Sequence, residues 1–556
     1  MPSVSAHVAL TLARHIDHVF GVMGNGNAYF LDALEKQTDA EYTAVRHEQG
    51  AVVAADAHFR ASGRIAAATA TYGAGFTNTL TALAEAVQAH APLVLVVGDE
   101  PTSGPRPWDV DQIALASGVG ARTYTAGHAD AAATTVIAIE HALTYRVPVV
   151  LAIPYDVATL EAGPVPEAPE PRLPAPLAPR GEFGEGMLEE IARALHAAER
   201  PFLLAGRGAW LAGAGEALGA LADTTGALTA STALGRGVFP DARYDLGVTG
   251  GFGADGAMAL VREADVAVVF GASLNQFTMR FGELFSPGTR VFQVDIAPAA
   301  THAHVGGFVR GDARIVAERL VERVRAAAAS AADAASRMPW RESVDVAAAR
   351  GYDAGDELAP DGRLDPRSAA RRIAELLPEE RVVVSDGGHF IGWANMYWPV
   401  ASPDRMMMVG TAFQAIGQGW PSVVGATRAR PEATVVLTSG DGGGLMAIAD
   451  LESAVRAARG RGMAVIWNDA AYGAEVNLYG LKGLAEEPML IPEVDFAALS
   501  QAVGAEGVVV RSLADLERLR TWTAEDPASR RFLVLDLRVS GRVIAPYQQE
   551  IIRVNS

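Results

Sequence analysis

The chain has 556 residues, half of them hydrophobic, and a formal net charge of -19, so it can form several buried cores and is not attracted to nucleic acid or to an anionic membrane surface. It contains no cysteine, which excludes disulfides, thiolate metal sites and a cysteine nucleophile. The amphipathic residues 1–22 do not have the pattern of a signal peptide, and no apolar run reaches membrane-spanning length. We therefore predict a cytoplasmic protein that acts on a small molecule.

The first part of the chain alternates apolar strand patterns with helical patterns. Between Val4 and Asp156 the strand patterns are "HVFGVM", "EYTAVR", "RIAAATATY", "PLVLVVGD" and "VPVVLAIP". Continuous β-rich runs separated by helices predict parallel strands that are buried on both faces. The proline-rich segment from Gly163 to Gly181 then predicts an extended tether.

Two further units repeat this alternation. The second has strand patterns "PFLLAG", "DVAVVFGA" and "RVFQVDI" and ends in a predicted helix over residues 312–335, and the third has "VVVSDGG", "ATVVLTSGD", "MAVIWND" and "RFLVLDL". The predicted fold class is α/β with three doubly wound parallel-sheet domains. We expect a first domain at 1–165, a linker at 166–184, a middle domain at 185–340, a linker at 341–365 and a third domain at 366–556.

An acid and an amide follow two strands of the third unit. The strand "ATVVLTSG", the helix "MAIADLESAVRAARG" and the strand "MAVIWND" form a right-handed β-α-β unit. Asp441 and Asn468 therefore lie at the carboxyl ends of parallel strands, where open α/β sheets bind ligands. Their side-chain oxygens and the main-chain carbonyl of Ala470 suit Mg²⁺ or Ca²⁺ completed by phosphate oxygens. The metal would separate the acid from the phosphates.

An ordinary nucleotide-binding turn is the alternative for this segment. The glycines of "GDGGG" do not form G-x-G-x-x-G because Leu445 occupies the third glycine position. Asp441 would also face a pyrophosphate without a counterion. Asp469, at the end of the second strand, could still bind the ribose of a nicotinamide nucleotide.

The sequence resembles a known family at several separate segments. Gly-Asp-Gly with Asn468 placed 26 residues after Gly442 is similar to the metal and diphosphate signature of thiamine diphosphate (ThDP) enzymes. "FGVMGNGN", "RHEQGAVVAADAHFRASG" and "TYGAGFTNTLTALAEAVQAHAPLVLVVGD" resemble, in order and spacing, the pyrimidine-binding domain of acetolactate synthase-like ThDP enzymes, and "GRGAWLAGAGEALGALADTTGALTASTALGRGVFP" and "VFQVDIAPA" resemble the middle domain. The resemblance implies a pyrimidine-binding, a middle and a diphosphate-binding domain.

Glu48 stands where a predicted strand ends and a helix begins. By itself it is an acid favoured by the helix dipole, but the resemblance implies that it bonds to and protonates N1′ of the aminopyrimidine. The resemblance also implies that the Gln414 carbonyl accepts from the 4′-amino group and that Ile416 bends the cofactor. The implied cofactor-binding residues are Glu48, Gly388, His389, Gln414, Ile416, Gly440, Asp441, Gly442, Gly443, Asn468 and Tyr472, and the implied Mg²⁺ ligands are Asp441, Asn468 and Ala470.

The expected substrate pocket departs from that of acetolactate synthase. "YGAGFTN" replaces S-G-P-G-A-T-N, "VDQ" at residues 110–112 replaces F-Q-E, and "DAAYGAEVNLYG" lacks the usual M-V and Trp. The paired histidines of pyruvate and indolepyruvate decarboxylases are missing too, since His128 is isolated. We expect the substrate to be surrounded by Asn25, Tyr72, Phe76, Gln112 and Glu475.

The resemblance implies a ThDP- and Mg²⁺-dependent lyase or transferase that decarboxylates a 2-keto acid, with or without carboligation. The alternatives are an aldehyde lyase similar to benzoylformate decarboxylase, a nucleotide-dependent oxidoreductase and a catalytically silent ThDP-binding protein. Some relatives bind FAD in the middle domain, but no motif here requires it. In the family the first domain of one subunit faces the third domain of its partner, so we expect a homodimer or homotetramer with shared active sites.

Overall fold

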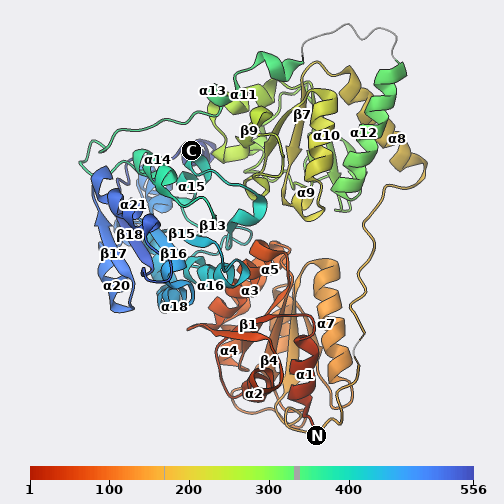
Figure 1. The fold of residues 1–556 in the computed structure, drawn as a ribbon, viewed down its shortest axis with the longest axis vertical. Coiled ribbons are helices and arrows are strands. Elements are labelled where there is room, and N and C mark those ends of the chain that lie inside the picture. The colour runs from red at the N-terminus through yellow and green to blue at the C-terminus, as the bar shows by residue number, and fades with distance from the viewer. Residues whose placement is uncertain (168, 331–338, 556) are drawn as a thin grey trace.

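The computed structural model describes residues 1–167, 169–330 and 339–555, and these residues form three units. Each unit is built on a six-stranded sheet whose strand pairs are parallel. In Figure 1 the first unit lies at the bottom, the second at the upper right and the third at the left. The predicted α/β fold class with three parallel-sheet domains is confirmed. In the described part of the chain, no helix combines the length and the apolar character needed to cross a membrane.

The first unit has the strand order β2-β1-β3-β4-β6-β5. Its inner strands β3, β4 and β6 are buried along their whole length, as continuous apolar runs predict. Its elements are β1 (His18–Gly21), β2 (Glu41–Ala44), β3 (Ala66–Ala70), β4 (Leu93–Asp99), β5 (Arg122–Thr125) and β6 (Pro148–Pro154), with α1 (Val4–Leu12), α2 (Ala28–Gln37), α3 (Glu48–Ser62), α4 (Ala74–Thr77), α5 (Leu80–Gln88), α6 (Gln112–Gly118) and α7 (Ala131–Tyr145).

The second unit has the strand order β12-β11-β10-β7-β8-β9. The helix predicted over 312–335 corresponds to α12, and residues 331–338 lie outside the described residues. The first helix of the unit begins at Gly181, inside the linker predicted at 166–184. The elements are β7 (Pro201–Ala205), β8 (Leu228–Ser231), β9 (Asp245–Val248), β10 (Val266–Phe270), β11 (Arg290–Asp295) and β12 (Val305–Arg310), with α8 (Gly181–Ala197), α9 (Arg207–Leu211), α10 (Gly215–Thr225), α11 (Asp255–Glu263), α12 (Ala313–Ser330) and, in the following segment, α13 (Val346–Ala349).

The third unit has the strand order β14-β13-β15-β16-β18-β17, so β15 and β16 are neighbours at its centre. The elements are β13 (Arg381–Ser385), β14 (Met406–Met408), β15 (Thr434–Gly440), β16 (Gly462–Asn468), β17 (Glu506–Val510) and β18 (Leu533–Arg538), with α14 (Pro366–Leu376), α15 (Ile391–Tyr397), α16 (Gly419–Ala429), α17 (Asp441–Met446), α18 (Leu451–Ala458), α19 (Gly473–Leu478), α20 (Phe496–Ala502), α21 (Glu517–Ala524) and α22 (Pro546–Asn555).

The first and third units meet along helices α3 and α16, which lie side by side (Figure 1). Gly50 faces Pro421 near the start of both helices, and Arg430 Nε donates to the Ala61 carbonyl (2.9 Å) near their ends. The two helices therefore run in the same direction. Their backbones approach closely at Gly425, where an added Cβ would lie 2.0 Å from a carbonyl oxygen of α3. A side chain at this position would push the helices apart.

Candidate active site

Asp441 and Asn468 lie at the same edge of the third sheet. Strands β15 and β16 are paired in parallel, with Gly440 opposite Trp467. Asp441 directly follows Gly440, and Asn468 directly follows Trp467. The two residues therefore lie at corresponding positions at the carboxyl ends of neighbouring strands. This is the arrangement that the β-α-β pattern predicts.

The carboxylate of Asp441 is buried at this edge. It accepts the N–H groups of Gly442 (2.8 Å) and Ala470 (2.9 Å). Burial, and next the nearby carboxylate of Asp469, raise the pKa of Asp441 to about 7. A bound cation would reverse both effects, because it supplies the opposite charge that a buried carboxylate needs.

Asn468 presents a buried oxygen at the same edge of the sheet. Its Nδ2 donates to Asp536 Oδ1 (2.9 Å) and to the Val494 carbonyl (2.9 Å), and these two bonds fix the orientation of the amide. Its Oδ1 is buried and has no hydrogen-bond partner among the residues that the structure describes. Because buried polar atoms are normally paired, an unpaired amide oxygen beside a carboxylate is the kind of donor that fits a hard cation.

Ala470 supplies the third predicted ligand, a main-chain carbonyl. The residue has a φ of 62°, in the left-handed region that non-glycine residues rarely adopt. Its N–H is bonded to Asp441, and its carbonyl accepts from the N–H of Ile491 (2.9 Å), which leaves one lone pair for a metal. A carboxylate, an amide oxygen and a carbonyl oxygen together fit Mg²⁺, with further positions for phosphate oxygens.

The predicted diphosphate loop lies beside these ligands. His389 Nε2 is 3.2 Å from a carboxylate oxygen of Asp469, the residue that the nucleotide alternative assigns to a ribose. Gly473 faces the same imidazole ring closely enough to leave no room for a side chain. Gly388 has a φ of 110°, so the loop needs glycine at this point.

The predicted cofactor-bending loop is fixed by an acid that sequence reasoning missed. The buried carboxylate of Asp386 accepts the N–H groups of Gly417 and Gln418, both at 3.1 Å. The preceding Gln414 has a φ of 63°, and the side chain of Ile416 is 40% exposed, unusual for an isoleucine beside a sheet edge. An exposed apolar side chain on a fixed loop is available to pack against a ligand. The signal for Asp386 was an acid directly after a buried strand.

The glycines of α17 have packing neighbours as well as a predicted phosphate role. An added Cβ on Gly442 would lie 2.8 Å from the ring of Tyr472, and one on Gly443 would lie 2.7 Å from Asp386. On Gly440 it would lie 3.0 Å from Phe390. These positions therefore need glycine for backbone packing, whatever binds above them.

Glu48 is the first residue of α3, and Asn78 holds its side chain. The Asn78 amide donates to Glu48 Oε2 (3.0 Å), and Asn78 was not among the residues predicted from the sequence. Two residues before Glu48, the N–H of Arg46 donates to the buried carboxylate of Asp450 in the third unit (2.8 Å). The end of α3 that carries Glu48 is thus attached to the unit that carries Asp441.

Within one chain, the structure therefore joins the two units that carry the halves of the predicted site. The expected homodimer or homotetramer with sites shared between chains stays a prediction. The two arrangements can be distinguished by the activity of a mixture of two inactive variants, one altered in each unit.

The five predicted substrate residues do not all lie at a surface. Asn25 Nδ2 donates to the hydroxyl of Tyr72 (2.8 Å) at the edge of the first sheet. Phe76 is fully buried, and Gln112 is 3% exposed with its amide bonded within the first unit. Glu475 is exposed on α19 in the third unit. Their contact with a substrate stays a prediction.

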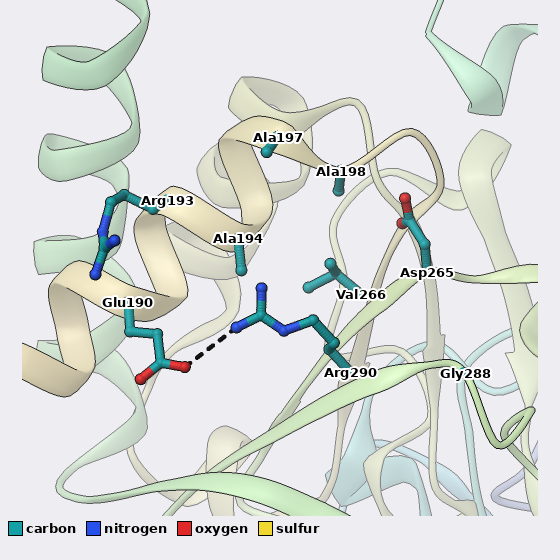
Figure 2. A pocket seen from close by; sticks show the side chains of 9 residues that line it. All are labelled: Glu190, Arg193, Ala194, Ala197, Ala198, Asp265, Val266, Gly288 and Arg290. Carbon is teal, nitrogen blue, oxygen red and sulfur yellow. Dashed lines mark hydrogen bonds and ion pairs between the residues drawn. The ribbon is translucent and has the colours of Figure 1, made fainter.

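A hollow of about 360 Å³ lies in the second unit, away from these residues. Figure 2 shows it beside α8, where Arg290 and Glu190 form an ion pair (3.1 Å). It is at the amino ends of β10 and β11, whereas α/β sheets bind ligands at the carboxyl ends. No predicted site residue lines it; the lining residues are Glu190, Arg193, Ala194, Ala197, Ala198, Asp265, Val266, Gly288 and Arg290.

The chain is similar to known proteins along most of its length. A sulfoacetaldehyde acetyltransferase of Alcaligenes xylosoxydans xylosoxydans is 28% identical, covering 93% of this chain and 89% of the relative. The large subunit of acetolactate synthase isozyme 3 of Escherichia coli (strain K12) is 27% identical, covering 95% and 92%. A solved structure described as a thiamin diphosphate-dependent enzyme from Mycobacterium smegmatis has a TM-score of 0.77 at 22% identity, covering 97% and 100%, and supports the fold alone.

Family models match each of the three units. Residues 2–117 match the N-terminal TPP binding domain of thiamine pyrophosphate enzymes, residues 188–332 match the central domain, and residues 386–536 match the C-terminal TPP binding domain. The three matches follow the order of the three sheets, and the two cofactor-binding domains are those that carry Glu48 and Asp441. The chain belongs to the thiamine pyrophosphate enzyme family.

Proposed function

We propose that the protein is a ThDP- and Mg²⁺-dependent enzyme that breaks or forms a carbon–carbon bond next to a carbonyl, by decarboxylating a 2-keto acid with or without transfer of the remaining fragment. The observation that carries this proposal is the unpaired, buried Oδ1 of Asn468 beside the buried carboxylate of Asp441. That pair supports a bound cation, and the matching TPP binding domains support the diphosphate that the cation would hold.

The residues of the chain have separate tasks in this proposal. Asp441, Asn468 and the Ala470 carbonyl hold Mg²⁺, and Ile416 packs against the cofactor between its two rings. Glu48, bonded to Asn78, holds a proton at N1′ of the pyrimidine and moves it as general acid and base. When bound, ThDP supplies a carbon nucleophile that also stores the electrons released on decarboxylation.

The substrate is the part of the function that the sequence departures leave open. We propose a screen of aliphatic and aromatic 2-keto acids, in which CO₂ release and the carbon–carbon-bonded products are both measured with ThDP and Mg²⁺ present. Release of CO₂ with an aldehyde product identifies a decarboxylase, and release with a joined product identifies a carboligase. If purified, cofactor-loaded protein turns over none of these acids, the 2-keto acid proposal is wrong.

A second candidate function is cleavage of an anionic aldehyde. Proteins named sulfoacetaldehyde acetyltransferase are as similar to this chain as acetolactate synthase is, which supports this candidate. Arg106 also lies near the predicted substrate residues, with its guanidinium 4.0 Å from the centre of the Tyr72 ring. That guanidinium is bonded to Asp109 (2.6 Å), so it is held in a fixed position. Release of sulfite from sulfoacetaldehyde, with transfer of the acetyl group to an added acceptor such as inorganic phosphate and without CO₂ release, would favour this candidate.

We also propose that the chain forms a homodimer, or a pair of such dimers, with the active sites shared between subunits. Two-fold closure is the commonest symmetry of soluble homo-oligomers, and the family resemblance implies a partner at the face of the first domain that carries Glu48. The contact between α3 and α16 lies within one chain in the structure, and this proposal expects an equivalent contact between subunits. Sedimentation of the active species as a monomer would contradict this proposal.

A further inference from the structure

The loop that carries Gln414 and Ile416 is bonded to a buried acid of a different unit. Glu85 on α5 is fully buried, and its carboxylate accepts the N–H groups of Phe413 (2.6 Å) and Ala412 (3.3 Å). These donors directly precede Gln414 in the chain. One carboxylate of the first unit therefore fixes the backbone of the third unit immediately before the predicted cofactor contact.

The charge of Glu85 is balanced inside the same contact. Arg60 Nη2 donates both to Glu85 Oε1 (3.2 Å) and to Asp56 Oδ2 (2.8 Å), and Arg60 Nε donates to Asp56 Oδ1 (2.7 Å). Arg60 Nη1 also donates to the carbonyl of Met408 (2.9 Å), at the end of the strand that precedes the loop. The guanidinium and the two N–H groups therefore give the buried carboxylate of Glu85 hydrogen-bond partners on both sides of the contact between the units.

The other end of the loop is held in the same manner. The carboxylate of Asp386 accepts the N–H groups of Gly417 and Gln418. The segment between the two acids contains Gln414 in its left-handed conformation and the partly exposed Ile416. A non-glycine residue stays in this strained region only when its surroundings determine it from both sides.

We infer that Glu85 is a positioning residue: through the N–H groups of Ala412 and Phe413, the first unit sets the conformation of the loop that presents the Gln414 carbonyl and Ile416 to the cofactor. The inference rests on the proposed function, because the cofactor gives those two residues their role. It adds a link between the pyrimidine-binding and diphosphate-binding units to the Arg46–Asp450 bond and the contact of α3 with α16. Loss of this link would leave Glu48 and the predicted metal ligands in place and would move the loop that carries Gln414 and Ile416.

The test compares Glu85→Gln with Asp56→Asn. The amide at position 85 keeps the shape of the side chain but has one acceptor oxygen for two N–H donors, whereas Asp56→Asn perturbs the same buried cluster without touching the loop. Hydrogen exchange of peptides over residues 410–417 is measured without cofactor, and ThDP affinity is measured in the presence of Mg²⁺. Melting temperatures record the general destabilisation of each variant.

We expect Glu85→Gln to speed exchange in this loop and to weaken ThDP binding, each by about 10- to 100-fold, as for loss of hydrogen bonds to a charged group. Asp56→Asn is expected to lower the melting temperature with a much smaller change in both. Equal loop exchange in Glu85→Gln and the wild type, or equal changes in the two variants, would overturn the inference. If Glu85→Gln does not fold, Glu85→Asp replaces it, because aspartate keeps the charge but is shorter by one methylene. The same loop exchange and ThDP affinity are then measured, and the same results would support or overturn the inference.

The proposed function and the role of Glu85 would be contradicted by different results. If the wild type does not bind ThDP with Mg²⁺, the proposed function is wrong. If the wild type binds ThDP and Glu85→Gln binds it equally well, the proposed function stands and the role of Glu85 is wrong.

Discussion

Substitution of Gly425 by alanine tests whether the contact between α3 and α16 sets the geometry of the site. The added Cβ would lie 2.0 Å from the carbonyl oxygen of Ala54, and real Cβ atoms essentially never come closer than 3.0 Å. The atoms that the added Cβ would meet are backbone atoms of Ala54, so no side chain can turn away to make room. The helices must therefore separate by at least 1.0 Å, the difference between these two distances. Overpacking of this kind costs about 1–3 kcal/mol.

The matched control is Gly186→Ala in α8, where an added Cβ meets nothing within 4 Å. Both substitutions gain the same helix propensity, roughly 1 kcal/mol for glycine to alanine. The difference between the variants therefore isolates the clash, and we expect the melting temperature to fall in Gly425→Ala and not in Gly186→Ala.

The separation of the helices also predicts a loss of function. Glu48 begins α3, and Ile416 lies just before α16, so the shift moves these two predicted cofactor contacts relative to each other. A misplacement of about 1 Å can cost on the order of 10²-fold in rate. The assay is turnover of the substrate identified by the screen, together with ThDP affinity. Equal melting temperatures and equal turnover for Gly425→Ala and Gly186→Ala would refute the reasoning.

Three further predictions concern the residues of the site. Glu48→Gln should bind ThDP with unchanged affinity and lose about 10²- to 10⁴-fold in turnover, because an amide bonds to N1′ without supplying a proton; full turnover would leave Glu48 as a helix-start residue. Asp441→Ala should fold, as judged by circular dichroism, yet show no ThDP binding by calorimetry at millimolar Mg²⁺, and retained affinity would refute the metal assignment. Mixing these two variants with subunit exchange should restore about a quarter of the wild-type activity if sites are shared, since half of randomly paired dimers are hybrids with one intact site of two. Sites contained within single chains predict no recovery.

The sequence predicted the inner strands of each sheet more readily than the outer ones. The strands β3, β4, β15 and β16 are buried along their length, so their apolar runs are continuous. The missed β5, β9, β12, β14 and β17 are edge strands of the three sheets, and β5 is largely accessible. The missed β8 is an inner, buried strand of only four residues. Half-exposed or very short strands do not produce a continuous apolar run.

The local pattern was sufficient to place the predicted metal ligands at one sheet edge, but not to identify the residues that position them. Asp441 and Asn468 belong to one β-α-β unit, whose connection rule places them side by side. Asp450, by contrast, bonds to Arg46, which is 404 positions away in the chain. Glu85 and Asp386 likewise contact backbone N–H groups that no periodicity can identify. Phe76 and Gln112 show the same limit, since their burial depends on the packing of the whole first unit.

The melting temperature of the wild type with added cofactors tests the central claim most directly, because a ligand that binds only the folded state stabilises it. At a ThDP concentration 100 times Kd this stabilisation is about 2.7 kcal/mol. We predict that ThDP and Mg²⁺ together raise the melting temperature, that removal of Mg²⁺ with a chelator largely abolishes the rise, and that Asp441→Ala shows none. A rise with NAD alone, and none with ThDP and Mg²⁺, would contradict the assignment of this site to thiamine diphosphate.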